Sequence, residues 1–224
     1  PRSKQSLILA HHKGNFFKPC PGRQAKEGFK GVCCNYFVIN YASNCHMECS
    51  YCYLQSYLNF PYMTIYANEA DLVAELKSAF AQSPQEFFRI GTGELADSLA
   101  LDPLTSYSTV LVEFFARQPN AVLELKTKSN CVENLLRLEH EGKTVVSWSM
   151  NPRYVQEREE HKTASISQRL KAAKECVRAG YPVGFHLDPL IFYAGWETGY
   201  KDLIEEIFQV VPGTSVAWIS LGSL

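Results

Sequence analysis

Apolar and polar positions alternate along most of the chain in two different rhythms. Short runs rich in β-branched and aromatic residues, typical of buried strands, recur about every thirty residues. They predict six strands, at residues 36–41, 86–91, 121–127, 144–150, 182–188 and 215–221. Between these runs, amphipathic patterns predict five helices, at residues 68–80, 104–117, 131–141, 164–179 and 199–210. Strands that alternate with helices form a parallel sheet with right-handed crossovers, so we expect an α/β fold, either an open doubly wound sheet or a partly closed barrel.

Residues at the ends of these patterns predict the boundaries of helices and domains. Asn68 is the expected N-cap of the first helix, and Gly142 and Gly180 are expected to end the third and fourth. Residues 1–35 are rich in Gly, Pro, Lys and aromatics without an apolar period, which predicts an irregular arm packed on a core domain of residues 36–224. Because the chain stops right after its sixth strand, we expect it to be a fragment that lacks its C-terminal end.

The composition is that of an ordinary globular domain, with 224 residues, 46% of them hydrophobic and 20% charged. A formal net charge of −1 neither favours nor excludes nucleic acid as a partner. No segment resembles a signal peptide or a membrane span, so we expect a cytoplasmic protein without membrane contact. Eight cysteines are many for a reducing compartment, where disulfides are rare, and the count points to metal binding or catalysis.

Three of these cysteines, Cys45, Cys49 and Cys52, form a C-x3-C-x2-C motif after the first predicted strand. Such short spacings allow the thiolates to converge on one group. A structural zinc site needs four ligands, and only three thiols are close together here. A cubane 4Fe–4S cluster held by three thiolates keeps one iron without a protein ligand, open to a small molecule. The alternatives are free thiols or part of a zinc site.

The motif, with the aromatic Tyr51 just before its third cysteine, resembles the radical S-adenosylmethionine superfamily. The resemblance implies a partial (β/α)6 barrel of the TIM type with parallel strands. It also implies that Cys45, Cys49 and Cys52 are the ligands of a 4Fe–4S cluster. In that superfamily the open iron chelates the amino and carboxylate groups of S-adenosylmethionine, and one electron cleaves the sulfonium to give a 5′-deoxyadenosyl radical.

A second motif, G-T-G-E, ends the second predicted strand and resembles the glycine-glycine-glutamate motif that binds the methionine amino group in this superfamily. Gly91 and Gly93 let the backbone approach a ligand, and Glu94 offers an acceptor. The segment alone is a weak signal, because a turn after any strand can contain it. Its place one αβ unit after the cysteines strengthens the interpretation.

Polar residues also end the next three predicted strands, at the sheet edge where α/β proteins bind ligands. Lys128 suits a carboxylate, and Ser149 and Asn151 are small hydrogen-bonding groups, with mere loop polarity as the alternative. His186 and Asp188 share one face of the fifth strand, and a structural role is the alternative for the histidine. We expect Lys128, Ser149, Asn151 and Asp188 to contact the cofactor.

A narrower resemblance, to spore photoproduct lyase and its relatives, covers roughly residues 36 to 200. It rests on the segments NCHMECSYCYLQSYLNFPYMTIYAN, EHEGKTVVSWSMNPRYV, RLKAAKECVRAGYPVGFHLDPL and GWETGY, in matching order. It implies repair of a methylene-bridged thymine dimer in DNA, in which hydrogen is returned through a cysteine and a tyrosine pair. The tyrosines would be Tyr51 and Tyr53, Lys128 and Ser149 would contact S-adenosylmethionine, and a flavodoxin or ferredoxin would supply the electron.

The hydrogen-donor cysteine of the lyase does not carry over. It belongs at the end of the second strand, where this chain reads GTGELADS, so the return step is expected to be slow or the reaction to differ. Cys131 could substitute, but nothing in the sequence brings it near a substrate. The alternative functions are a radical enzyme acting on a peptide or small molecule and a non-catalytic iron–sulfur or zinc module. The spacing of Cys20, Cys33 and Cys34 matches no known site, so we interpret them as structural thiols, with an auxiliary metal as the alternative.

Overall fold

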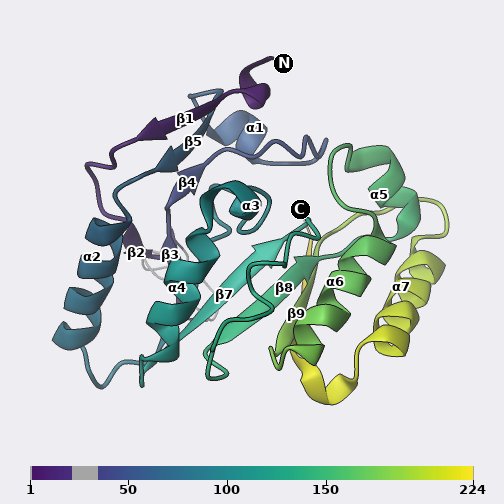
Figure 1. The fold of residues 1–224 in the computed structure, drawn as a ribbon. Helices are drawn as coiled ribbons and strands as arrows, with labels where there is room; N and C mark the ends of the chain where they lie inside the picture. Colours follow the sequence, from purple (N-terminus) through teal and green to yellow (C-terminus); the bar gives the residue numbers. More distant parts are fainter. Residues whose placement is uncertain (1, 22–34, 224) are drawn as a thin grey trace, which may run out of the picture.

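The computed structural model describes residues 2–21 and 35–223 of the chain. Its main element is a seven-stranded sheet in the order β10-β9-β8-β7-β6-β3-β2 (Figure 1). The strands are β2 (Phe17–Pro19), β3 (Tyr36–Ile39), β6 (Phe88–Gly91), β7 (Ala121–Thr127), β8 (Thr144–Ser149), β9 (Val183–Leu190) and β10 (Val216–Ser223). All neighbours from β3 to β10 are parallel, which confirms the six predicted strands and the partial (β/α)6 barrel. Strand β2 adds an antiparallel edge beside β3.

Helices lie along one face of this sheet (Figure 1), where α4 packs on β7 and β8 and α6 packs on β8 and β9. The helices are α1 (Leu54–Tyr57), α2 (Glu69–Gln82), α3 (Asp102–Thr105), α4 (Tyr107–Ala116), α5 (Arg153–Glu159), α6 (Ile166–Arg178) and α7 (Trp196–Val210), with 3-10 turns η1 (Arg2–Gln5) and η3 (Gly213–Ser215). Within the described ranges, no helix combines the length and the apolar character needed to cross a membrane.

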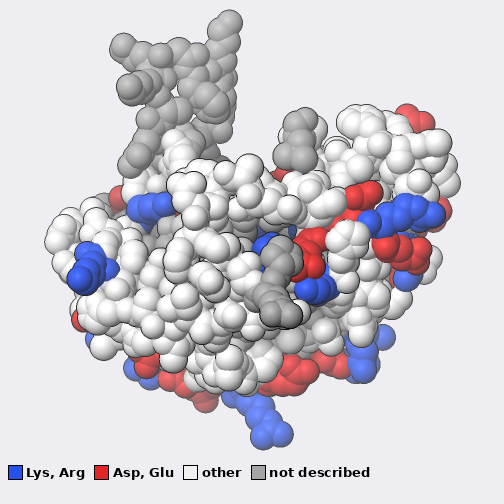
Figure 2. All heavy atoms as spheres, turned by 90° about the horizontal axis from the view of Figure 1, so that it is seen from above, with Lys and Arg blue, Asp and Glu red and all other residues white. Residues whose placement is uncertain are grey.

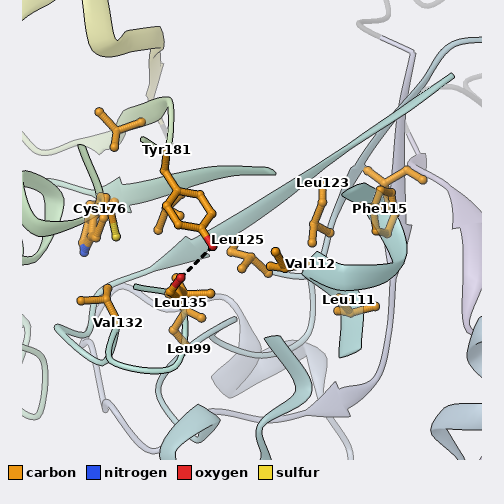
Figure 3. Packing of buried hydrophobic residues seen from close by; sticks show 14 of the residues in the cluster. Leu99, Leu111, Val112, Phe115, Leu123, Leu125, Val132, Leu135, Cys176 and Tyr181 are labelled. Atoms are coloured by element: carbon orange, nitrogen blue, oxygen red, sulfur yellow. Dashed lines mark hydrogen bonds between the residues drawn. The ribbon is translucent and has the colours of Figure 1, made fainter. Parts of the chain in front are cut away.

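The core between helices and sheet fixes the strands that carry the candidate site. In Figure 3, Val112 and Phe115 of α4 lie beside Leu123 and Leu125 of β7, and all four are at most 1% exposed. Burying such a side chain is worth about 1.5–3 kcal/mol, so this layer holds β7 firmly in the sheet. The carboxyl end of β7 leads directly to Lys128.

A small second sheet was not predicted. It has the order β1-β5-β4 and consists of β1 (Leu7–Ala10), β4 (Ala42–Ser43) and β5 (Met63–Tyr66). Strands β1 and β2 both lie in the stretch that we expected to be irregular, although the domain division itself stays a prediction. These strands have four residues or fewer, and β2 includes Pro19, which an edge strand tolerates, so their pattern is too short to stand out.

One predicted helix differs from the structure in its boundaries, and one predicted cap differs in its hydrogen bonds. The helix predicted at 104–117 is divided into α3 and α4 by Ser106, whose φ of 52° is left-handed. Asn68 does precede α2, but its side chain makes no capping bond and instead joins the backbone of His12 and the Asp71 carboxylate. Gly180 ends α6 at a φ of 92°, as predicted.

The prediction of a helix at 131–141 is wrong. The segment forms successive turns, in which the N–H of Leu135 donates to the carbonyl of Val132 and the N–H of Leu138 donates to that of Leu135. The Tyr181 hydroxyl donates to the Leu135 carbonyl at 2.9 Å (Figure 3), an acceptor that a helix would use internally. The apolar spacing therefore reflects burial of a turn-rich segment, and Gly142, with a φ of 67°, sits in a turn and ends no helix.

Candidate cofactor site

One cavity opens at the carboxyl ends of the strands, with a volume of about 880 Å³ counted to its open mouth. Its lining residues are Cys45, Met47, Cys49, Tyr51, Cys52, Tyr53, Leu54, Gly93, Glu94, Ala96, Asp97, Lys126, Thr127, Lys128, Ser149, Asp188 and Pro189. Ten of the twelve predicted site residues are in this set, and only Gly91 and Asn151 are not. The structure thus gathers side chains that the sequence spreads over more than 140 positions.

The visible face of the molecule seen from above has Lys and Arg side chains interspersed with Asp and Glu (Figure 2). Charges of opposite sign placed side by side partly cancel each other's field at a distance. Among the described residues in this view, the charged side chains therefore form no large patch of one sign.

The cysteine loop after β4 is a series of tight turns. The N–H of Cys52 donates to the carbonyl of Cys49 at 3.1 Å, and the N–H of Cys45 donates to the Asn44 side chain at 2.8 Å. Burial raises the pKa of the Cys45 thiol to about 12 and that of Cys49 to about 11. These thiols are therefore protonated at neutral pH, and because metal ligation uses thiolates, it would release protons from them.

In the described part of the chain, no group of three or more His, Cys, Asp or Glu side chains is arranged to hold a metal ion as it stands. The donor set of Cys45, Cys49 and Cys52 nevertheless fits a cluster in its chemistry, because all three thiols line one cavity. Their assignment as ligands stays a prediction.

Tyr51 lies between the cavity and a buried polar network. Its hydroxyl donates to the Glu160 carboxylate and accepts from the Asn151 amide at 3.1 Å. The Lys128 ammonium lies 5.6 Å from the centre of the Tyr51 ring, within range of a cation–π contact. Burial, with the Glu160 charge, raises the pKa of Tyr51, so the phenol stays neutral. Asn151 therefore supports the site from behind the cavity wall.

Glu160 and Arg169 form an ion pair whose side chains are both fully buried. Although burial alone would raise the pKa of Glu160, the Arg169 charge lowers it, so the carboxylate stays ionised. Neither residue was among those predicted from the sequence. A signal was available for Arg169, which falls on the apolar face of α6 with Leu170 and Ala173.

Glu94 already has partners from two other strands. Lys18, from β2, and the amide of Asn40, which follows β3, both approach its Oε2 at 3.0 Å. The Tyr53 hydroxyl donates to the backbone carbonyl of Glu94. Burial, with the Glu94 charge, raises the pKa of Tyr53 to about 12. An amino group that binds Glu94 has to share this carboxylate with Lys18. Lys18 was not among the site residues predicted from the sequence.

Asp97, which the sequence analysis missed, joins the G-T-G-E loop to the end of β7. Its carboxylate accepts from the Thr127 hydroxyl at 2.6 Å and from the backbone N–H of Lys128 at 2.8 Å. It also accepts from the N–H groups of Leu99 and Ala100, in an Asx-type turn. Asp97 therefore sets the position of Lys128 at the cavity.

The two predicted glycines have different surroundings. A Cβ on Gly91 would lie 1.8 Å from the Tyr36 hydroxyl, so this glycine makes room for a tyrosine of the neighbouring strand. A Cβ on Gly93 would lie 3.3 Å from the Lys126 Cβ, and Gly93 lines the cavity. Gly91 thus contributes to packing behind the site.

His186 belongs to a polar network in the sheet and does not line the cavity. Its Nε2 lies 2.6 Å from the Glu124 carboxylate, and its Nδ1 lies 2.5 Å from the Ser220 hydroxyl. These contacts agree with a structural role for His186. Asp188, in contrast, lines the cavity as predicted.

The remaining cysteines lie apart from the cavity or outside the described residues. Cys131 lines a different cavity together with Asp102 and Asn134, so the structure does not bring it to the predicted ligands. Cys20 is partly exposed and free. Cys33 and Cys34 lie outside the described residues.

The chain resembles curated proteins over most of its length. It is 32% identical over 177 residues to the spore photoproduct lyase of Bacillus subtilis strain 168, which covers 79% of this chain and 52% of the relative. It is 33% identical over 182 residues to that of Geobacillus sp. strain Y412MC61, covering 81% of this chain and 53% of the relative. The chain thus spans about half the length of the curated relatives it matches.

Solved structures and a family model agree with these relatives. A spore photoproduct lyase variant with bound AdoMet and dinucleoside spore photoproduct superposes with a TM-score of 0.84 at 30% identity, covering 96% of this chain and 62% of the other. A variant with dinucleoside spore photoproduct gives 0.82 at 30% identity, covering 94% and 59%. The family model described as spore photoproduct lyase matches residues 31–221. The chain belongs to the spore photoproduct lyase family.

Proposed function

We propose that this chain holds the cofactor centre of a radical S-adenosylmethionine enzyme of the lyase type. Cys45, Cys49 and Cys52 would ligate a 4Fe–4S cluster, and S-adenosylmethionine would bind beside it. The observation that supports this most strongly is that the three thiols share one cavity with Glu94 and Lys128, which arrive there from different strands. A zinc site or a redox module does not require those two charged groups beside its thiols.

Each side chain at the cavity has a role that its chemistry allows. When bound, the cluster and S-adenosylmethionine supply the one-electron cleavage that starts the reaction. Lys128 offers a positive charge for the methionine carboxylate, and Ser149 and Asp188 offer hydrogen-bonding groups at the ends of β8 and β9. Glu94 is an acceptor for the methionine amino group. Gly93 has no side chain, so a ligand can approach the backbone at this point of the cavity wall.

The substrate that we propose is a thymine-dimer lesion in DNA. It is supported by two solved relatives that contain dinucleoside spore photoproduct. Tyr51 and Tyr53 would return hydrogen, since both rings line the cavity and Tyr53 is 51% exposed. A cytoplasmic flavodoxin or ferredoxin would be the electron donor.

A different substrate, such as a peptide or small molecule, remains the second candidate. It is favoured by the loop after β6, which lines the cavity with Glu94, Ala96 and Asp97 and contains no thiol. Because a phenol O–H is a harder hydrogen donor than a thiol, repair through the two tyrosines alone should be slow.

An anaerobic assay separates these functions. The chain is reconstituted with iron and sulfide, then given S-adenosylmethionine and dithionite, and 5′-deoxyadenosine is quantified. Product is expected for either enzymatic function, whereas an intact cluster without product leaves only the non-catalytic module. Adding dinucleoside spore photoproduct and following deuterium from labelled cofactor then tests the substrate, since repair is expected only for a lesion-specific enzyme.

A further inference from the structure

We propose that the buried ion pair of Glu160 and Arg169 positions the cysteine loop and Lys128 for cofactor binding. The inference rests on the proposed function and adds two positioning residues that do not line the cavity. Four sets of contacts carry it, and each connects the ion pair or its neighbours to a different part of the cavity wall.

The first set holds the cysteine loop from outside. Cys49 forms an isolated antiparallel bridge with Glu160, and the N–H of Ser50 donates to the carbonyl of Glu159 at 2.8 Å. The N–H of Lys162 donates to the carbonyl of Met47 at 3.0 Å. Residues 47–50 are thus paired along their backbone with residues that follow more than 100 positions later.

The second set runs through Tyr51. Its hydroxyl donates a hydrogen bond to the Glu160 carboxylate. On the other side of this network, the side chain of Asn151 accepts a hydrogen bond from the Tyr200 hydroxyl at 2.7 Å. The Tyr51 ring in turn lies under the Lys128 ammonium. Glu160 therefore acts on Lys128 through the orientation of one aromatic ring.

Arg169 makes the third set, with the backbone near the cavity. Its guanidinium donates to the carbonyl of Ser149 at 2.8 Å and to that of Ala164 at 2.9 Å. The N–H of Ala164 donates to the carbonyl of Lys128 at 3.0 Å, which is the fourth set. One planar cation thus joins the ends of β7 and β8 to the cysteine loop.

A fixed wall lowers the cost of cofactor binding, because groups that are already ordered lose less conformational freedom when the ligand arrives. A hydrogen bond to a charged group contributes more than one between neutral groups. Loss of the Tyr51–Glu160 bond is therefore expected to loosen the Tyr51 ring and Lys128 together.

The test measures S-adenosylmethionine affinity by equilibrium dialysis of cluster-loaded protein, with the spin-resonance spectrum of the reduced cluster as a second readout. Tyr51→Phe removes only the hydroxyl, and Glu160→Gln removes the charge at nearly constant shape. We expect each to weaken binding about tenfold and to shift the spectrum. The matched controls are Tyr181→Phe, which loses a buried tyrosine hydrogen bond in the core, and Glu157→Gln, at an exposed position of α5; both should match the unmodified chain.

Equal affinity and an equal spectrum for Tyr51→Phe and the unmodified chain would overturn the inference. If Glu160→Gln does not fold, because it leaves Arg169 unpaired in the interior, Tyr51→Phe decides alone. An unmodified chain that takes up no cluster or binds no S-adenosylmethionine overturns the proposed function itself, so the two failures are distinguishable.

Discussion

Glu124 is a carboxylate buried in the sheet whose ionisation depends on three donors. The Tyr36 hydroxyl, the Ser147 hydroxyl and the His186 ring approach it at 2.5 to 2.6 Å. Burial opposes ionisation, but the hydrogen bond and charge of His186, together with the hydrogen bonds from Ser147 and Tyr36, outweigh it and lower the pKa of Glu124 from 4.5 to about 2. A carboxyl group whose pKa is lowered by folding stabilises the fold at pH values above its ordinary pKa. This stabilisation is lost as the pH falls from about 4.5 towards about 2.

We therefore expect Glu124→Gln to lower the free energy of unfolding by about 3 kcal/mol at pH 7 and by less at pH 3.5. Urea unfolding of both chains at the two pH values measures the difference. If the difference in unfolding free energy between the two chains is equal at both pH values, ionisation of Glu124 does not stabilise the fold.

Gly91 gives a second prediction at this scale. Because a Cβ there would collide with the Tyr36 hydroxyl, Gly91→Ala should destabilise the chain by about 1–3 kcal/mol. Gly14→Ala is the control, since its nearest neighbour would be the His12 ring at 3.4 Å, and it should change stability by less than about 0.5 kcal/mol. Thermal or urea unfolding checks both, and equal stability of the two variants contradicts the packing role.

Single residues of the site could be predicted when they belong to a motif or lie at the end of a predicted strand. The cysteines, Glu94, Lys128 and Ser149 belong to this class, and the structure brings them to one cavity. Glu160, Arg169 and Asp97 could not be found in the same way. Their importance comes from burial and from partners far along the chain, neither of which a local pattern records.

At the scale of elements, the long parallel strands were predictable because buried strands require continuous β-branched and aromatic runs. The segment at 131–141 misled the prediction, since turns under a loop can bury Val132 and Leu135 at helical spacing. Strands β1, β4 and β5 were missed because two to four residues are too few for a period to emerge.

Helix α6 offers a test at this scale, since it carries Arg169. Ser165 caps it in a capping box, where the N–H of Gln168 donates to the Ser165 hydroxyl and the Ser165 N–H donates to the Gln168 side chain. Ser165→Ala should cost about 1 kcal/mol of unfolding free energy. Ser167→Ala, at an exposed position of the same helix, should not be destabilising, and equal losses in the two variants would argue against the cap.

At the scale of the whole molecule, the parallel order of the strands explains how distant motifs meet. The carboxyl ends of β6, β7, β8 and β9 open on one edge of the sheet, and the cysteine loop lies across that edge. This arrangement follows from the alternation of strands and helices and could be predicted. The support behind the wall, where residues 159–162 pair with the cysteine loop, depends on contacts over more than 100 positions and could not.

The most direct test of the account is whether the three cavity cysteines hold the cluster. Each of Cys45, Cys49 and Cys52 is replaced by alanine, with Cys131→Ala, which lies at another cavity, as the control. After anaerobic reconstitution, iron content and the spin-resonance spectrum of the reduced protein are recorded with and without S-adenosylmethionine. The unmodified chain and the Cys131 variant should give a 4Fe–4S signal that changes when S-adenosylmethionine is added, and the other three variants should lose it. A full signal in Cys49→Ala would contradict the assignment.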